Sequence, residues 1–412
     1  MHMSKRFWTG AFAAVAAAAS LTACGGGSGG ANNEGVSKDE VTIGVMVDGS
    51  GPTASDQLPW QHGFEAYVKR LNDAGGVDGR KVKVVVKDDK FDAAVGVTAY
   101  KSLESQTPSL AIFGLGSGGP QSAVAPLAAK DEIPVVTGLL TTKESLVPFN
   151  PYVFGMAPSY ADQVDVILAH GKEKVGSDTP RVAVVDNGAA TGIEVEELVE
   201  ERAVEGVEYA GAVAFPPTET TGDAIVQKLI SMKPDFVVYH GGAGNVNLLM
   251  KAQAKFGTEM PVIGITPTGS YAAYQGLDPE VGNLFEFVQW STPSTLEVEG
   301  TKQLLEDAEA AGFGEDDISA STFTQGYVAG MVLEEALKGA GDDPTRESFR
   351  DALEGISDLD TLGLSSSIRY SAENHGGASG LRPMKYDYAT ETFETLGEFS
   401  DYEGFIVHQY TK

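Results

Sequence analysis

Ala111-Ile-Phe-Gly-Leu-Gly-Ser-Gly-Gly-Pro120 is the stretch that decides the fold, and it continues into Gln121-Ser-Ala-Val-Ala-Pro-Leu-Ala-Ala129. It predicts a short buried strand, a glycine-rich turn and a helix that opens at Pro120. Free backbone N–H groups at the helix start and the Ser117 hydroxyl are then expected to face the space above the strand end. The pattern predicts a cradle for a small carboxylate or carbonyl group.

Two enzyme motifs match this stretch only in part. Gly114-x-Gly116-x-x-Gly119 satisfies the dinucleotide-binding fingerprint, which also needs an acidic residue about 20 positions later. The next predicted strand and the turn after it, residues 133–142, contain no acid. A nucleophile elbow requires G-x-S-x-G, and Leu115 stands where its first glycine belongs. A ligand cradle at the edge of a cleft and a tight turn without a ligand remain as interpretations.

Composition narrows the class of protein. The chain has 412 residues, of which 42% are hydrophobic and 50 are glycine, which favours two α/β domains over one. A net charge of −29 disfavours binding to nucleic acid or to an anionic membrane surface. The six histidines are scattered, and no zinc motif or Ser-His-Asp set can be assembled from the spacing. We therefore expect neither an enzyme nor a metal or cofactor site.

The first 24 residues have the features of a targeting segment. Lys5-Arg6 precede an apolar run from Phe7 to Ser20, and Leu21-Thr-Ala-Cys24 follows. This arrangement resembles a bacterial lipoprotein signal, which implies cleavage before Cys24, lipid attachment to its sulfur and an extracytoplasmic location on the cell membrane. Cys24 is the only cysteine, so no intramolecular disulfide can form. Residues 25–40 are predicted to be a flexible tether, and no later stretch is apolar enough to span a membrane.

Strands alternate with helices in the first part of the chain. Strands are predicted at residues 41–47, 82–86, 111–114 and 133–137, with helices near 64–71 and 93–105 between them. This order indicates right-handed βαβ units and a mainly parallel sheet. Ligands of such sheets gather at the carboxyl ends of the strands. The predicted site therefore collects the loop 50–60, the turn 116–118 and residues 138–142.

Several short motifs recur in order across residues 41–145: Ile43-Gly with Ser50-Gly-Pro52, Asn72-x-x-Gly-Gly-Val-x-Gly-Arg80, Asp88-Asp89, Gly114-x-x-Ser-Gly with Ala123-x-x-Pro126, and Ile133-Pro134. Their order and spacing resemble the type I periplasmic binding proteins of the leucine/isoleucine/valine class. The resemblance implies an α/β fold of two doubly wound lobes with mainly parallel sheets, joined by three crossovers. It also implies that the lobes close on a small solute and deliver it to an ABC importer.

A second βαβ series begins at Arg181 and has strands near 209–214, 235–240 and 260–264. It repeats the architecture of the first series, as the resemblance requires. We assign residues 41–156 and 290–376 to the first lobe, and residues 157–289 and 377–412 to the second. The tail from Glu391 is expected only to contribute acidic surface.

The resemblance assigns binding roles in the first lobe. Gly116, Ser117 and Gly118 match the glycine turn whose hydroxyl and N–H groups hold the carboxylate of an amino acid. Leu139 and Thr141 match the second contact loop. Trp60 stands two residues from the family spacing, so an apolar wall of the site and a core position are both open for its side chain.

The second lobe departs from the family pattern at two loops. The loop 187–192, which contains Ala190, lacks the usual aromatic residue. Residues 265–271, which contain Thr266, lack the carboxylate that pairs with the ammonium group of an amino acid. A buried ammonium without a counter-charge costs several kcal/mol. We therefore hypothesise a ligand without an ammonium group: an amide, a hydroxy or keto acid, or an aromatic acid.

Two further side chains are candidates for contact with the ligand. His240, at a strand end, is expected to donate to a polar ligand or to bond the backbone of its own loop. Trp290, near the return to the first lobe, is expected to stack on the ligand tail. The expected partners are the small solute and an ABC permease, with the chain monomeric and membrane contact only through the lipid. A ligand-sensing receptor with the same clamshell is the alternative, although the end at Lys412 favours a tethered binding protein.

Overall fold

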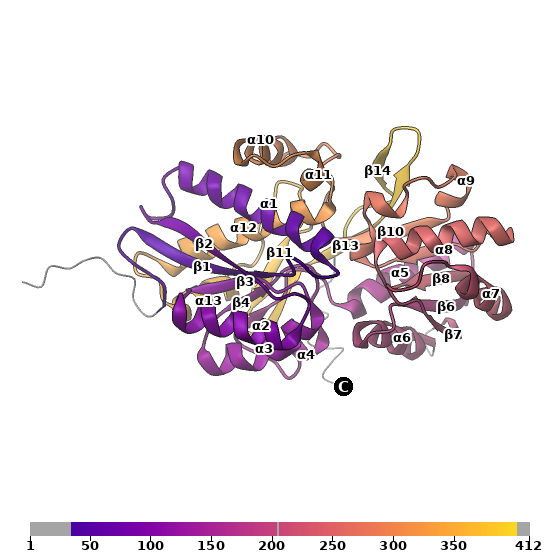
Figure 1. Ribbon diagram of the computed structural model, residues 1–412, viewed down its shortest axis with the longest axis horizontal. Helices are drawn as coiled ribbons and strands as arrows, with labels where there is room; N and C mark the ends of the chain where they lie inside the picture. Colours follow the sequence, from indigo (N-terminus) through magenta and orange to yellow (C-terminus); the bar gives the residue numbers. More distant parts are fainter. Residues whose placement is uncertain (1–33, 204–205, 402–412) are drawn as a thin grey trace, which may run out of the picture.

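The computed structural model describes residues 34–203 and 206–401, which form two α/β lobes side by side (Figure 1). The predicted signal segment with Cys24 lies outside these residues, as does most of the predicted tether. Residues 34–40, which we had placed in the tether, pack on the first lobe. Val36 is 5% exposed in the apolar core and pairs with Val41. The packed chain thus begins before the predicted boundary, because the apolar side chain of Val36 is buried.

A parallel sheet forms the centre of the first lobe. Its strands, in spatial order, are β2 (Lys81–Asp88), β1 (Glu40–Val47), β3 (Ala111–Gly114), β4 (Val135–Thr137) and β5 (Val153–Phe154). Alternate side chains point to opposite faces, so that Val45 and Val47 join one apolar cluster and Met46 joins another.

Helices cover both faces of this sheet. One face carries α1 (Ala54–Asp73) and α12 (Ser321–Ala340), and the other carries α2 (Ala93–Lys101) and α3 (Gly118–Asp131). Smaller elements complete the lobe: the π-helix Ser102–Gln106, α4 (Lys143–Leu146), α10 (Thr301–Ala311), α11 (Glu315–Ile318), α13 (Arg346–Glu354), and the antiparallel pair β11 (Ile368–Ser371) and β12 (Asn374–Ala378).

α1 begins at Ala54, inside the stretch that we had predicted as a loop, so Trp60 lies on a helix. The helix packs closely on α12 through facing glycines. A methyl group on Gly63 would lie 2.0 Å from the carbonyl oxygen of Phe323, and one on Gly326 would lie 1.8 Å from that of Trp60. These two positions bring the backbones of the helices into contact only because neither carries a Cβ atom.

The second lobe has a mixed sheet. The strands β7 (Glu208–Ala214), β6 (Arg181–Asp186), β8 (Phe236–Tyr239), β9 (Val262–Gly264) and β10 (Phe285–Gln289) are parallel neighbours in that order. Three antiparallel strands extend it: β13 (Gly380–Asp387), β14 (Thr392–Thr395) and β15 (Ser400–Asp401).

The helices of this lobe again cover both faces. One face carries α5 (Tyr160–Val175) and α6 (Ala190–Arg202), and the other carries α7 (Asp223–Met232) and α8 (Ala243–Phe256). The short helices η3 (Thr266–Thr268), η4 (Tyr271–Ala273) and α9 (Pro279–Gly282) lie in the connections.

The expectation that the tail beyond Glu391 is only acidic surface is wrong. Its strand β14 pairs with β13, and Phe393 is 4% exposed. The Phe393 ring packs edge-on against Tyr274 and Tyr386, with ring centroids 5.9 and 5.6 Å apart. Phe393 is the one apolar residue of β14, and it is enough to bury one face of this strand.

The chain passes between the lobes after β5, after β10 and between β12 and β13. The first and third passages are hydrogen-bonded to each other, from Gly155 N–H to the His375 carbonyl at 2.7 Å and from Ala378 N–H to the Met156 carbonyl at 3.0 Å. Arg382 Nη2 donates to Thr292 Oγ1 at 2.7 Å, which joins the third passage to the second. The predicted fold class, with two lobes and three crossovers, is confirmed.

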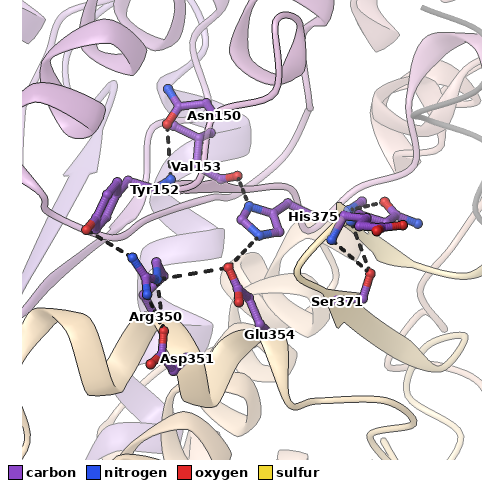
Figure 2. Close-up of polar contacts among 11 residues, drawn as sticks. Asn150, Tyr152, Val153, Arg350, Asp351, Glu354, Ser371 and His375 are labelled. Carbon is purple, nitrogen blue, oxygen red and sulfur yellow. Dashed lines mark hydrogen bonds and ion pairs between the residues drawn. The ribbon is translucent and has the colours of Figure 1, made fainter. Parts of the chain in front are cut away.

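His375 is buried behind the first crossover, between β5 and α13 (Figure 2). Its ring stacks on Phe154 with centroids 3.8 Å apart, and its Nδ1 lies 3.0 Å from the carbonyl oxygen of Val153. Because a carbonyl can only accept, Nδ1 carries the proton. Nε2 then offers a lone pair and lies 3.3 Å from Glu354 Oε1, and burial raises the pKa of the Glu354 carboxyl, which favours the protonated form that can donate to Nε2. Burial lowers the pKa of His375 to about 4, so the imidazole is neutral at pH 7.

We expect His375 to make the fold less stable in mild acid. Its folded pKa lies below the ordinary value of 6.5, so the unfolded chain binds the proton first and stability falls as the pH drops from 6.5 towards 4. Between pH 7 and pH 5 this histidine should remove about 2 kcal/mol from the free energy of unfolding. His375→Gln keeps a donor for Val153 and does not titrate. Urea unfolding at both pH values should show a loss that is smaller by about 2 kcal/mol in the variant than in the wild type; equal losses in the two proteins would contradict the assignment.

Candidate ligand-binding site

The carboxyl ends of three strands form one edge of the first sheet. Gly114 pairs with Met46 on one side and with Thr137 on the other, so β1, β3 and β4 end at the same level. The turn 115–117 and the loop 138–142 follow these strands directly. The structure thus brings together the predicted glycine turn and the predicted second contact loop.

The second sheet has a matching edge. Tyr239, Gly264 and Phe287 lie in one row across β8, β9 and β10. His240 and Thr266 come shortly after the first two strands, and Trp290 comes after the third. Their side chains are buried, with 4%, 2% and 0% exposed surface. These three predicted site residues therefore gather at one edge of the second sheet.

The two edges face each other. A methyl group on Gly118, at the start of α3, would lie 3.4 Å from Cγ2 of Thr191 at the start of α6. One continuous buried apolar cluster also contains Trp60 and Leu139 of the first lobe together with Tyr160, Ile265 and Trp290. The lobes are thus in contact where the candidate residues lie, and this interlobe region is the candidate site.

A chain of buried amides connects the lobes beside the site. Thr266 N–H donates to Gln163 Oε1 on α5 at 3.0 Å, and its carbonyl accepts from Gln289 Nε2 at 3.3 Å. Gln325 Nε2, on α12, donates to Gln289 Oε1 at 3.2 Å. Thr266 thus contributes its backbone to an interlobe hydrogen-bond network, in which Gln325 of the first lobe bonds Gln289 of the second.

The glycine turn differs from the prediction in two respects. α3 begins at Gly118, before Pro120, so the N–H groups at the start of this helix lack intrahelical partners there. The Ser117 hydroxyl is fully buried and already bonded, since it accepts from Gln57 Nε2 at 2.8 Å and donates to Asp89 Oδ1 at 3.3 Å. Gly116 lies against the Gln57 side chain, because a Cβ atom on Gly116 would lie 3.0 Å from Gln57 Cδ. The turn is a structured part of the lobe as well as a candidate contact.

The second contact loop lies against this turn. Leu139 is 8% exposed, and its Cδ1 would lie 3.3 Å from a methyl group on Gly116. Thr141 Oγ1 donates to the carbonyl of Ala157 at 2.9 Å, so its hydroxyl proton binds the first crossover. Leu139 therefore offers apolar surface, while Thr141 holds the loop on the crossover.

Trp60, His240 and Trp290 share an unusual feature. Each is at least 96% buried, and each has a ring nitrogen without a hydrogen-bond partner among the described residues: Nε1 of both tryptophans and Nδ1 of the histidine. Burial lowers the pKa of His240 to about 4, so this ring is neutral at pH 7. Leaving a buried donor unpaired costs about 1–3 kcal/mol. These three nitrogens are therefore positions where a bound molecule would supply missing partners.

Ring contacts hold two of these side chains in place. The Trp60 ring stacks on Phe64 with centroids 5.7 Å apart, and a methyl group on Gly138 would lie 3.1 Å from Trp60 Cε2. The His240 ring meets Tyr160 edge-on at 5.2 Å. Trp60 thus lies against the second contact loop, and His240 against the first residue of α5.

Ala190 is placed differently from the other candidates. It is exposed at the start of α6, and its neighbour Thr191 is the residue that approaches Gly118. Thr191, Gln57 and Asp89 are absent from the predicted set, although all three contact its members. In the sequence, Asp88-Asp89 stands out only as part of a family motif, and Gln57 lies in the stretch 50–60 that is predicted to be a loop. An acid directly after a strand, as at Asp89, is the sequence signal that could have found it.

Other features of the described chain do not compete with this site. A hollow of about 800 Å³ lies between α12 and α13, lined by Glu335, Asp351, Asp358 and Asp360 among others, and it contains none of the candidate residues. Within residues 34–203 and 206–401, no three His, Cys, Asp or Glu side chains are placed to hold a metal ion. In the same ranges, no helix has both the length and the apolar character of a membrane span.

Two α/β lobes whose strand ends face each other define a two-lobed ligand-binding protein of the doubly wound type. The family described as "Periplasmic binding protein" matches residues 40–391. The chain belongs to this family and, within it, to the type I proteins of the branched-chain amino acid class.

Relatives of known identity share most of the chain. A chemotactic signal transduction system substrate-binding protein, BasB of Halobacterium salinarum, is 24% identical over 385 residues, which cover 90% of this chain and 87% of BasB. A branched-chain amino acid ABC transporter protein from Thermus thermophilus with bound valine superposes with a TM-score of 0.80 at 21% identity, covering 90% of this chain and 99% of that one. A fatty acid ABC transporter substrate-binding protein from Thermomonospora curvata superposes with a TM-score of 0.78 at 21% sequence identity. The match covers 91% of this chain and 95% of that one.

Proposed function

We propose that this protein is a solute-binding lipoprotein of an ABC importer, anchored outside the cytoplasmic membrane through a lipid on Cys24 and active as a monomer. The two lobes close around a small organic solute and deliver it to the permease. Open and closed states of such a clamshell differ by a few kcal/mol, so a ligand that bridges both lobes shifts the population. The role is binding and delivery, with no chemical step.

The observation that carries this proposal is the set of unpaired buried nitrogens at Trp60, His240 and Trp290. They come from α1, from the end of β8 and from the end of β10, so both lobes contribute. A ligand oxygen that accepts from the two indole N–H groups, and a ligand group that pairs with His240 Nδ1, remove the cost of leaving these atoms unpaired. The aromatic rings add apolar surface for the rest of the molecule.

We further propose that the solute has no ammonium group. No carboxylate occurs in residues 265–271, and Asp186, the acid at the end of β6, already accepts from Gly188 N–H at 2.6 Å. An amide, a hydroxy or keto acid, or an aromatic acid fits these conditions. The Thermus relative holds valine, whereas the Thermomonospora relative is named for fatty acids, which lack an ammonium group. Relatives with this fold therefore differ in this property.

A ligand-sensing role is the second candidate. It is favoured by BasB, which is named for chemotactic signal transduction and matches 90% of this chain. The two functions require the same closed form of the two lobes and differ in the partner protein that binds this form. Co-purification with a permease supports import, and co-purification with a signal transducer supports sensing.

A thermal-shift screen tests the proposed solute class. The chain from Gly25 onward is heated with branched-chain amino acids, their keto acids, short amides and aromatic acids at equal concentration. A solute at 100 times its Kd should add about 2.7 kcal/mol to the free energy of unfolding, and we expect this only from ammonium-free compounds. Stabilisation by the amino acids alone would contradict the proposed class.

The variant Trp290→Phe connects any hit to the site. It keeps an aromatic ring and removes the Nε1 donor, so we expect binding to weaken by roughly 10-fold, or about 1.4 kcal/mol. Trp8 precedes Gly25, where the tested chain begins, so Trp8→Phe cannot serve as a control. Tyr209→Phe on β7, whose hydroxyl bonds Glu196 at 2.6 Å, removes one polar atom away from the site and should leave the affinity unchanged.

A further inference from the structure

A chain of hydrogen bonds runs behind the glycine turn from Asp48 through Gln57 and Ser117 to Asp89, and the Asp48 N–H group determines which atoms donate in it. The backbone N–H of Asp48 donates to Gln57 Oε1 at 2.9 Å. Because a backbone N–H can only donate, the other end of this amide, Nε2, is the end that meets Ser117 Oγ at 2.8 Å. Ser117 therefore accepts from Gln57.

Ser117 has one proton left to donate, and Asp89 receives it. Its hydroxyl donates to Asp89 Oδ1 at 3.3 Å, and the same oxygen accepts from Phe91 N–H at 2.9 Å. Asp89 is fully buried, and its other oxygen has no hydrogen-bond partner in the part of the chain that the structure describes. An ionised carboxylate can only accept. With Asp89 ionised, Ser117 thus has only a lone pair to offer to a ligand.

The start of α3 supplies donors beside this lone pair. The N–H groups at the beginning of the helix have no intrahelical carbonyl to bond. A ligand carboxylate could accept from them, but it would also meet the Ser117 lone pair and the negative charge of Asp89. A carboxamide or hydroxyl offers an acceptor and a donor together, so it satisfies both groups.

We propose that Asp89 fixes Ser117 as a hydrogen-bond acceptor, so that the turn 116–118 selects the carboxamide or hydroxyl end of a solute over a carboxylate. This inference rests on the proposed function, since it takes the turn as part of the solute site. Asp89 is a positioning residue, because it acts through the Ser117 hydroxyl. The inference reverses the carboxylate cradle that the sequence predicts here.

The charges around Asp89 make the selection depend on pH. Burial is the main cause that raises the pKa of Asp89 to about 6, and the neighbouring carboxylates Asp48 and Asp88 raise it further, while the bonds from Phe91 and Ser117 lower it. Lys90 is the adjacent cation and lowers the pKa of Asp88. Protonated Asp89 has no charge, and when it donates its proton to Ser117 Oγ, the Ser117 proton becomes free for a carboxylate.

Matched amide and acid pairs test this proposal: isovaleramide with isovalerate, and benzamide with benzoate. Calorimetric titration of the wild type at pH 7.5 should show the amide bound at least roughly 10-fold more tightly than its acid, and at pH 5.5 this ratio should fall several-fold. Asp89→Asn removes the negative charge, but its Oδ1 can still accept from Ser117 and Phe91, so Ser117 stays an acceptor. Its ratio at pH 7.5 should therefore fall only by the part that the charge contributes, and it should not respond to Asp89 titration, which also controls for protonation of the ligand.

Asp88→Asn is the matched control, because it also removes one carboxylate charge, at the neighbouring position. The Asp88 side chain bonds Gly49 and Ser50 and does not bond Ser117. We expect it to keep the wild-type selectivity. If Asp89→Asn does not fold, the test uses the wild type and Ser117→Ala. The amide-to-acid affinity ratio should change with pH in the wild type and should not change in Ser117→Ala.

Tighter binding of acids than of amides by the wild type, with a ratio that Asp89→Asn leaves within twofold, would overturn the inference while leaving the proposed function intact. The Ser117→Ala variant tests the proposed site itself. If this variant leaves the affinity of every bound solute unchanged, the turn is not part of the solute site.

Discussion

Gly118→Phe should keep the two lobes apart and weaken solute binding by roughly 100-fold, which corresponds to about 2.7 kcal/mol. Gly118 is half-buried at the start of α3, where a methyl group would already lie 3.4 Å from Thr191 Cγ2 of the other lobe. A phenyl ring needs far more space than this gap provides. The ligand must then close the lobes against a steric barrier, so the closed population falls.

The neighbouring glycine supplies the control. Gly119 is exposed, and a Cβ there would meet only Ala93 Cβ, at 3.9 Å. Gly119→Phe should therefore bind the solutes found in the thermal-shift screen as the wild type does. Small-angle scattering should show a larger radius of gyration for Gly118→Phe alone, with unchanged urea unfolding. Wild-type affinity and size in this variant would show that the lobes do not meet at Gly118.

Gly326→Ala should lower the free energy of unfolding by about 3 kcal/mol, at the upper end of the range for overpacking. The added methyl group would lie 1.8 Å from the carbonyl oxygen of Trp60 and 3.0 Å from the backbone nitrogen of Phe64. Both atoms belong to the backbone of α1, so a change of side-chain rotamer cannot relieve the contact. The two helices must separate, which opens the core on this face of the first sheet.

Gly244→Ala on α8 is the comparison, because a Cβ at this exposed position meets nothing within 4 Å. Alanine is the better helix former, so this variant should equal or exceed the wild type by up to about 1 kcal/mol. Urea unfolding followed by circular dichroism measures both. Equal stability of Gly326→Ala and the wild type would mean that α1 and α12 are farther apart than described. Ligand affinity should fall as well in Gly326→Ala, because Trp60 moves with α1.

Local pattern was sufficient for most elements. The alternation of Val41 to Val47 and the apolar spacing of Phe64, Tyr67, Val68 and Leu71 predicted β1 and much of α1, because burial on one face repeats at a fixed interval along the chain. The beginning of α1 was missed, since residues 54–60 carry no such repeat. β14 was missed because only Phe393 marks its buried face.

The candidate site was predictable only in part. Its strand ends follow from the order of elements, because parallel strands end at one edge of their sheet. The unpaired nitrogens of Trp60, His240 and Trp290 were not predictable, since the absence of a partner depends on every group that surrounds a side chain. The lobe boundaries and the roles of the site residues remain predictions.

The sequence by itself determined the fold class, the two βαβ series and the glycine turn before α3, because each depends on residues close together in the chain. Only the tertiary structure decided what the turn offers to a ligand. Gln57 and Asp89 reach Ser117 from 60 and 28 residues away, and the cross-lobe approach of Thr191 to Gly118 depends on how the lobes meet. Hydrogen-bond direction is a property of the assembled network, so no local pattern encodes it.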